Sequence, residues 1–202
     1  MRRASRAIRR TPSGGSVGTM RRIMIIRHAE KPGDADPDHG VSWNGVHDRH
    51  DLTVRGWQRA GALVRFFAPI GGPPNGRLAS PATIIASAAM VDSRSLRAQH
   101  TVLPLAVALG IAIDTRHADG EEDAVAATAL AAASPVLIAW HHHHIVSLAR
   151  KIGGSAIGCP RHWPDDRFDM VWVLDRSADG APWTFAQVPQ RLLAGDRADV
   201  VV

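Results

Sequence analysis

Short apolar runs of strand length alternate along the chain with longer segments in which apolar residues recur at helical spacing. The two kinds of segment follow one another in the order of βαβ units, so the pattern predicts an α/β fold. Strands are expected at 22–28, 82–88, 111–116, 135–140, 169–175 and 184–190, and helices at 52–67, 93–110, 121–134 and 144–154.

This alternation predicts a three-layer sandwich, in which a mainly parallel central sheet carries helices on both faces. Thr53 is suited to cap the first helix and Gly110 to end the second, which Pro104 should kink or divide. The last two strands are expected at an edge of the sheet, because Pro189 lacks a backbone N–H and an edge strand tolerates that loss.

Polar residues capable of chemistry stand directly after two of the predicted strands. Arg27 and His28 end the first strand, and His141 follows the fourth. Ligands of such sheets bind at the carboxyl ends of the strands. The three side chains are therefore expected at one rim of the sheet, and the site is expected there.

The net charge of +5 is concentrated at the start of the chain. The first 22 residues hold seven arginines and no acid, which leaves +5 − 7, or −2, on the rest. We therefore expect a basic, disordered tail at 1–20 and a single domain at 21–202. For the tail, three interpretations stay open: a true start at Met20, a basic arm that touches anions, and an organellar presequence.

The rest of the composition narrows the class of protein. No segment approaches the ~20 apolar residues of a membrane span, so no membrane partner is expected. The nearly neutral domain gives no reason to expect a specific nucleic acid either. The single Cys159 excludes an internal disulfide, and we expect a cytoplasmic protein.

Four motifs occur in the order RHAEKP, LTVRGWQRA, SRSLRAQHT and VLIAWHHHHI. Each alone has an ordinary explanation, such as a capped helix start or a solvated helical turn. Together, in this order and at these places in the predicted fold, they resemble the histidine phosphatase superfamily, with its phosphoglycerate mutase-like fold. The resemblance covers the chain from about residue 22 through the helix after His144.

The resemblance implies that His28 is a nucleophile and that Arg27, Arg97 and His141 bind the phosphoryl group. The residue types suit these roles. A neutral imidazole is nucleophilic near pH 7, and attack on phosphorus would form a phosphohistidine. Guanidinium groups neutralise phosphoryl oxygens through paired donors, so no metal and no other cofactor is expected.

The sequence departs from the family pattern around the second histidine and the general acid. The second histidine usually follows a glycine, whereas His141 follows Trp140 and begins a run of four histidines. His141 is preferred because it directly ends the strand, with His142 as the alternative. For the general acid we favour Glu121 over Glu122, although acids are also typical of a helix start.

A third departure concerns the phosphate-binding arginine. The usual Ser-Pro pair is replaced by the longer segment ASAAMVDSRSLRA. Arg97 fits the family spacing best, since Ala98 and Thr101 follow it, and Arg94 is the competitor one turn earlier.

The connection at 32–51 is about twenty residues long without a clear helical or strand pattern. Loops of this length in compact domains are usually functional or disordered, and this one leaves the nucleophile's strand. It is rich in Asp and His, as is 141–144, so a metal site is an alternative. No HExxH or paired CxxC spacing supports it, and adjacent histidines rarely converge on one ion.

The sequence thus predicts a metal-independent phosphomonoester hydrolase that acts on a phosphorylated small molecule, with a phosphopeptide as a further possibility. A mutase that returns the phosphoryl group to a second hydroxyl is one alternative, less favoured because the chain is short. A weakly catalytic module that binds phosphate ligands or proteins is the other.

Overall fold

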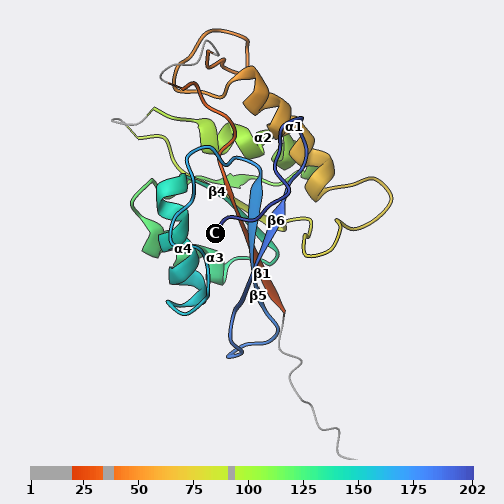
Figure 1. Ribbon diagram of the computed structural model, residues 1–202, viewed down its shortest axis with the longest axis vertical. Helices are drawn as coiled ribbons and strands as arrows, with labels where there is room; N and C mark the ends of the chain where they lie inside the picture. The colour runs from red at the N-terminus through yellow and green to blue at the C-terminus, as the bar shows by residue number, and fades with distance from the viewer. Residues whose placement is uncertain (1–19, 34–38, 91–93) are drawn as a thin grey trace, which may run out of the picture.

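The computed structural model describes residues 20–33, 39–90 and 94–202, so nearly all of the expected basic tail lies outside the described residues. In the described part, six strands form one sheet in the order β3-β2-β4-β1-β5-β6 (Figure 1). The expected α/β class is confirmed. The strands are β1 (Arg21–Arg27), β2 (Thr83–Ala86), β3 (Ile113–Asp114), β4 (Val136–Trp140), β5 (Met170–Arg176) and β6 (Thr184–Pro189).

Four of these strands are parallel: β4 pairs with both β1 and β2, and β3 pairs with β2. The register sets Arg27, the last residue of β1, opposite Trp140, the last residue of β4. The residues that follow these two strands therefore emerge side by side at the same rim. β5 and β6 complete the sheet as antiparallel strands.

Helices cover both faces of the sheet, as expected, and each pair of helices closes one apolar core. Alternate residues of β1 divide between these cores: Met24 and Ile26 pack with α1 and α2, whereas Ile23 and Ile25 pack with α3 and α4. No helix of the described residues is both long and apolar enough to cross a bilayer. The helices are α1 (Val54–Phe67), α2 (Arg97–Leu109), α3 (Glu122–Ala131) and α4 (His142–Gly153).

The structure corrects several details of the sequence-based elements. Of the last two strands, β5 lies inside the sheet between β1 and β6, and β6 forms an edge, with β3 at the opposite edge. α2 starts at Arg97, later than expected, and α4 starts at His142, two residues earlier than expected. Pro104 lies within the single helix α2 and does not divide it, since one missing N–H removes only one hydrogen bond.

The start of α1 is fastened to the segment that follows β1. Thr53 caps the helix, as expected, because its side chain accepts a hydrogen bond from the Gly56 N–H at 3.1 Å. The Thr53 N–H donates to the Glu30 carbonyl at 2.9 Å. A Cβ atom at Gly56 would lie 2.4 Å from that carbonyl oxygen, so only glycine allows this approach.

Candidate active site

His28 is the first residue after β1, and its backbone N–H donates to the Trp140 carbonyl at 3.0 Å. The side chain is 2% exposed, and Nδ1 lies 2.8 Å from the Ala29 carbonyl oxygen. A carbonyl can only accept, so Nδ1 carries the proton and Nε2 keeps its lone pair. Burial, reinforced by the charge of Arg27, holds the pKa of His28 well below 6.5. The ring is therefore neutral near pH 7.

His141 is the second imidazole of the site. Its ring centroid lies 5.5 Å from that of His28, with the ring planes at 70°. Burial lowers the pKa of His141, an effect that the nearby charge of Asp119 opposes. The alternative, His142, turns away: its Nε2 lies 2.8 Å from the Asp165 carboxylate. Of the two registers considered, the structure brings His141 to His28.

Arg27 is 1% exposed and lies beneath the loop that leads into β5. Its Nη1 donates to the carbonyls of Pro164, Asp165 and Arg167, and its Cζ lies 3.9 Å from the centroid of the Phe168 ring. Its Nε is buried without a hydrogen-bond partner among the described residues. Burial lowers the pKa of Arg27 to about 10. The cation is thus enclosed by carbonyl oxygens rather than by carboxylates.

Arg97 is the first residue of α2, and backbone oxygens hold its guanidinium group. Nη2 donates to the Arg49 carbonyl at 2.7 Å and Nε to the Asp51 carbonyl at 3.3 Å. Thr101 connects this helix start to the segment after β1, because its Oγ1 accepts a hydrogen bond from the Ala29 N–H and donates one to the Arg97 carbonyl, both at 2.7 Å. The end of the long 32–51 connection therefore positions Arg97.

The charge of Arg97 reaches the other members of the cluster. Burial is the largest cause that lowers the pKa values of Arg27, His28 and His141, and the positive charge of Arg97 lowers them further. Arg94, by contrast, is exposed to solvent. The structure thus gathers Arg27, His28, Arg97 and His141, the four residues expected around the phosphoryl group, at one rim.

The two glutamates considered as general acids have structural partners instead. The Glu121 carboxylate accepts a hydrogen bond from the Ala118 N–H at 2.7 Å. Glu122 is 5% exposed and accepts a hydrogen bond from the Trp140 indole N–H at 3.1 Å. This second contact satisfies the indole N–H of Trp140 at the end of β4.

Asp119 is the acidic side chain that sequence reasoning overlooked. It is a carboxylate whose charge acts on His141, where it opposes the lowering of the pKa by burial. Asp119 is the first acid after β3, whose carboxyl end faces the same rim, so its position in the sequence was the available signal.

Phe168 also had no sequence motif to mark it. Its ring centroid lies 6.2 Å from that of His28. The register pairs Ile26 of β1 with Val171 of β5, so the residues before β5 lie beside the end of β1. The antiparallel pairing of β5 with β1 was the signal that could have identified the loop before β5 as part of the site.

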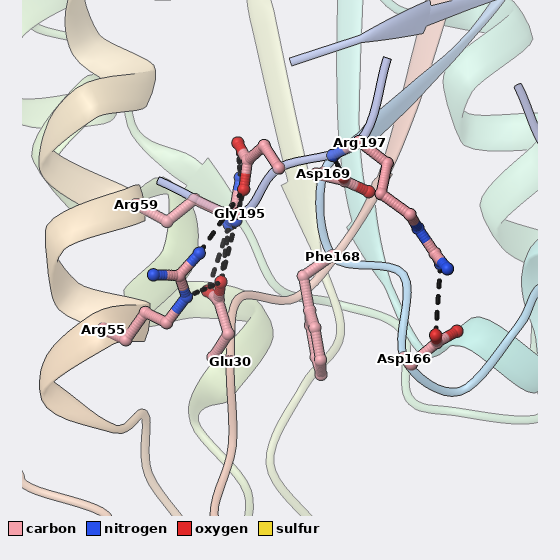
Figure 2. A pocket seen from close by; sticks show the side chains of 9 residues that line it. Glu30, Arg55, Arg59, Asp166, Phe168, Asp169, Gly195 and Arg197 are labelled. Atoms are coloured by element: carbon pink, nitrogen blue, oxygen red, sulfur yellow. Dashed lines mark hydrogen bonds and ion pairs between the residues drawn. The ribbon is translucent and has the colours of Figure 1, made fainter. Parts of the chain in front are cut away.

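Phe168 also lines a cavity of about 270 Å³ (Figure 2). In the view of Figure 2 the Phe168 ring is drawn between Glu30 and Asp166. Apart from Phe168 and one glycine, every lining residue is charged, so the cavity suits a polar group. The lining residues are Glu30, Arg55, Arg59, Asp166, Phe168, Asp169, Gly195, Asp196 and Arg197.

Arg59 closes this cavity from α1 and is 2% exposed. Its Nη2 lies 2.8 Å from Glu30 Oε1 (Figure 2). The same Nη2 lies 2.7 Å from Asp196 Oδ1, and Nη1 donates to the Gln190 side chain at 2.9 Å. Burial alone would lower the pKa of Arg59, but the hydrogen bonds from Arg59 to Asp196 and Glu30 outweigh it and raise the pKa. This arginine is fully paired.

No protein-family model and no curated protein matches the sequence. Several solved structures do. A protein described as mycobacterial hydrolase 1 is 14% identical, with a TM-score of 0.48, over 83% of this chain and 97% of its own. A mycobacterial glucosyl-3-phosphoglycerate phosphatase is 15% identical over the same shares, also with a TM-score of 0.48. A protein assigned as the phosphohistidine phosphatase SixA of Agrobacterium tumefaciens is 17% identical over 82% of this chain and 97% of its own, with a TM-score of 0.43. At this distance the likeness assigns no function by itself.

Proposed function

We propose that the chain is a phosphomonoester hydrolase that works through a phosphohistidine on His28. The observation that carries the proposal is the meeting of a buried, neutral imidazole with a second imidazole, at 5.5 Å between ring centroids, and with two guanidinium groups that contact backbone carbonyls instead of carboxylates. An anion pocket with a nucleophile inside it is what phosphoryl transfer requires, because positioning and charge neutralisation do most of the catalysis.

In the first step, the His28 Nε2 lone pair forms a bond to phosphorus while the bond from phosphorus to the ester oxygen breaks. Arg27, Arg97 and His141 donate hydrogen bonds to the three non-bridging oxygens. We assign Asp119, the first acid after β3 at this rim, to hold a proton and donate it to the leaving oxygen, which leaves the carboxylate ionised. In the second step, water attacks phosphorus and gives a proton to the Asp119 carboxylate while the bond from phosphorus to His28 Nε2 breaks. Phosphate leaves, and both His28 and Asp119 return to their starting forms.

The donors of this mechanism are all protein groups, so we propose that hydrolysis needs no metal ion. The leaving group is assigned to the charged cavity that Phe168 lines, which favours a small polar ester with hydroxyl or acidic substituents over an apolar one. A phosphorylated small molecule of this kind is the proposed substrate class.

Trapping the intermediate tests the proposal. The chain is mixed with a ³²P-labelled phosphomonoester in the presence of a chelator and quenched in alkali, which preserves phosphohistidine. We expect acid-labile label on His28, continued release of phosphate, and loss of both in His28→Ala. Label that returns to a second hydroxyl of the substrate would indicate a mutase instead. Tight phosphate binding without label or turnover would indicate a binding module and overturn the proposal.

The assignment of Asp119 has its own test, which compares two leaving groups. A nitrophenolate leaves readily without a proton, whereas an alkoxide does not. Asp119→Asn should therefore slow hydrolysis of an alkyl phosphate by about 10²–10⁴-fold and that of nitrophenyl phosphate far less. Glu121→Gln is the matched control and should change neither rate. An equal loss on both substrates in Asp119→Asn would remove Asp119 from this role.

A further inference from the structure

A cluster of metal-ligand side chains lies at the rim of the candidate active site, outside the four residues that meet the phosphoryl group. His143 Nε2 lies 3.2 Å from Asp119 Oδ2, and His144 Nε2 lies 3.9 Å from Asp119 Oδ1. One ligand atom from each of the three residues lies within 4.8 Å of the other two. Adjacent histidines were not expected to converge on one ion, yet both rings lie near one carboxylate.

We propose that Asp119, His143 and His144 bind a divalent transition-metal ion of the zinc type, and that this ion inhibits the enzyme by occupying the Asp119 carboxylate. The binding part stands independently of the catalytic mechanism, whereas the inhibitory part rests on the proposed function.

The donor set matches the chemistry of such an ion. Imidazole nitrogens and a carboxylate oxygen are preferred by zinc at about 2.0–2.2 Å, which sets neighbouring ligand atoms about 3–3.5 Å apart. The present separations need only small side-chain rotations to reach that spacing. Hard ions such as magnesium prefer an all-oxygen set, so they are expected to compete poorly.

The Glu122 carboxylate orients His144 through the ring nitrogen that does not face Asp119. His144 Nδ1 lies 3.4 Å from Glu122 Oε2. Glu122 is itself buried and accepts hydrogen bonds from the Trp140 indole and the Gly120 N–H, so it is rigidly held. A carboxylate on the far nitrogen is the usual partner of a metal-binding histidine, because it sets the tautomer that leaves the other nitrogen free to bind.

Solvent reaches the cluster, so an ion can enter without opening the fold. The side chains of His143, His144 and Asp119 are 52%, 35% and 33% exposed. Water can fill the remaining coordination position, as it does in three-ligand zinc sites. The nearby start of α4 carries a partial positive charge, which lowers the affinity for a cation but does not change which side chains bind it.

Binding of the ion would affect one catalytic role and spare the others. An Asp119 carboxylate bound to a metal is no longer available to the leaving oxygen, whereas Arg27, Arg97 and His28 are untouched. Zinc should therefore inhibit hydrolysis of an alkyl phosphate strongly and that of nitrophenyl phosphate weakly, and it should leave the affinity for inorganic phosphate unchanged.

The test uses the full chain, purified without a polyhistidine tag and freed of metal with a chelator. Titration with Co²⁺ followed by visible absorption, and with Zn²⁺ by calorimetry, should give one ion per chain. The variant His143→Ala/His144→Ala should lose the site. The matched control is His39→Ala/His47→Ala, which removes two exposed histidines whose ring centroids lie 5.0 Å apart elsewhere, and it should keep the site.

Asp119→Asn provides a second variant, with a circular dichroism spectrum to confirm folding, and it should weaken Co²⁺ binding at least tenfold. Absence of a stoichiometric ion in the wild type, or equal losses in the two double variants, would overturn the site. Binding without inhibition of alkyl phosphate hydrolysis would overturn the inhibitory role. A chain that binds Co²⁺ but never turns over a phosphomonoester would refute the proposed function while leaving the site intact.

Discussion

Two arginines of this molecule are equally buried and have opposite surroundings. Arg27 is 1% exposed and Arg59 is 2% exposed. Arg59 contacts the carboxylates of Glu30 and Asp196 within hydrogen-bond distance. Arg27 contacts backbone carbonyls and the face of Phe168, and among the described residues no carboxylate lies within ion-pair distance of it.

The difference is what we expect between an arginine that stabilises the fold and, as we propose for Arg27, one that binds an anionic ligand. The partners of Arg59 stabilise its charge and raise its pKa, whereas burial lowers the pKa of Arg27 to about 10. A buried cation without an acidic partner costs stability, and an anionic ligand can relieve that cost on binding. Burial alone therefore does not distinguish structural from functional charges, but the charge of their neighbours does.

The largest effect is expected from Arg59→Met. It removes the buried cation shared by Glu30 and Asp196 and leaves these acids only the partly exposed Arg55, so the free energy of unfolding should fall by about 3–5 kcal/mol. Urea denaturation measures this. Arg55→Met is the control, since Arg55 contacts the same two acids but its side chain is 40% exposed, and it should cost less than about 1 kcal/mol. Equal costs would contradict the distinction.

Arg27→Met should have the opposite profile. Because it removes a buried charge that has no acidic partner, stability should change little or increase. The loss of one preorganised donor should lower kcat/KM by about 10²–10³-fold. Steady-state kinetics and urea denaturation on the same sample check both parts. If Arg27→Met unfolds as readily as Arg59→Met, the comparison between the two arginines fails.

Arg97 extends the comparison to a cation that is only partly buried. Its guanidinium contacts the carbonyls of Arg49 and Asp51, and burial lowers its pKa. Arg97→Met should reduce kcat/KM by about 10²-fold. Arg94→Met removes the exposed arginine three residues earlier and should leave the rate unchanged. The reverse result would mean that Arg94 binds the phosphoryl group.

The smallest effect concerns the protonation of His28. Burial and then the charge of Arg27 lower its pKa, so His28 should stay neutral below pH 6.5, where an unfolded chain binds a proton. Protonation of His28 in the unfolded chain therefore destabilises the fold below pH 6.5, increasingly so until the pH reaches the lowered pKa of the folded state. Above pH 6.5 the group has no such effect. NMR titration of the His28 ring should show this pKa, and Arg27→Met should raise it. A wild-type pKa of 6.5 would contradict the burial argument.

Much of the fold could be predicted because its strands are continuous apolar runs and its helices have clear ends. The parallel order of β1 and β4 follows from the alternation of elements, and it places His28 beside His141. The length of the apolar run before the histidines located the end of β4 and so favoured His141 over His142.

The remaining parts of the site come from segments whose role depends on pairing. Phe168 and the carbonyls around Arg27 precede β5, and only the antiparallel pairing of β5 with β1 brings them to the rim. Asp196 reaches Arg59 from the end of the chain, where no motif marks it. Asp119 was obscured by two neighbouring glutamates whose partners are backbone and indole N–H groups.

The glycine at position 56 has a consequence for how variants of this protein are interpreted. Two backbones touch there, and the one opposite carries the nucleophile two residues upstream. Even the methyl group of alanine would displace the backbone at Glu30 and with it His28. A substitution on α1 would therefore lower the measured activity. Such a residue would be mistaken for part of the reacting machinery, although no atom of it needs to meet the substrate.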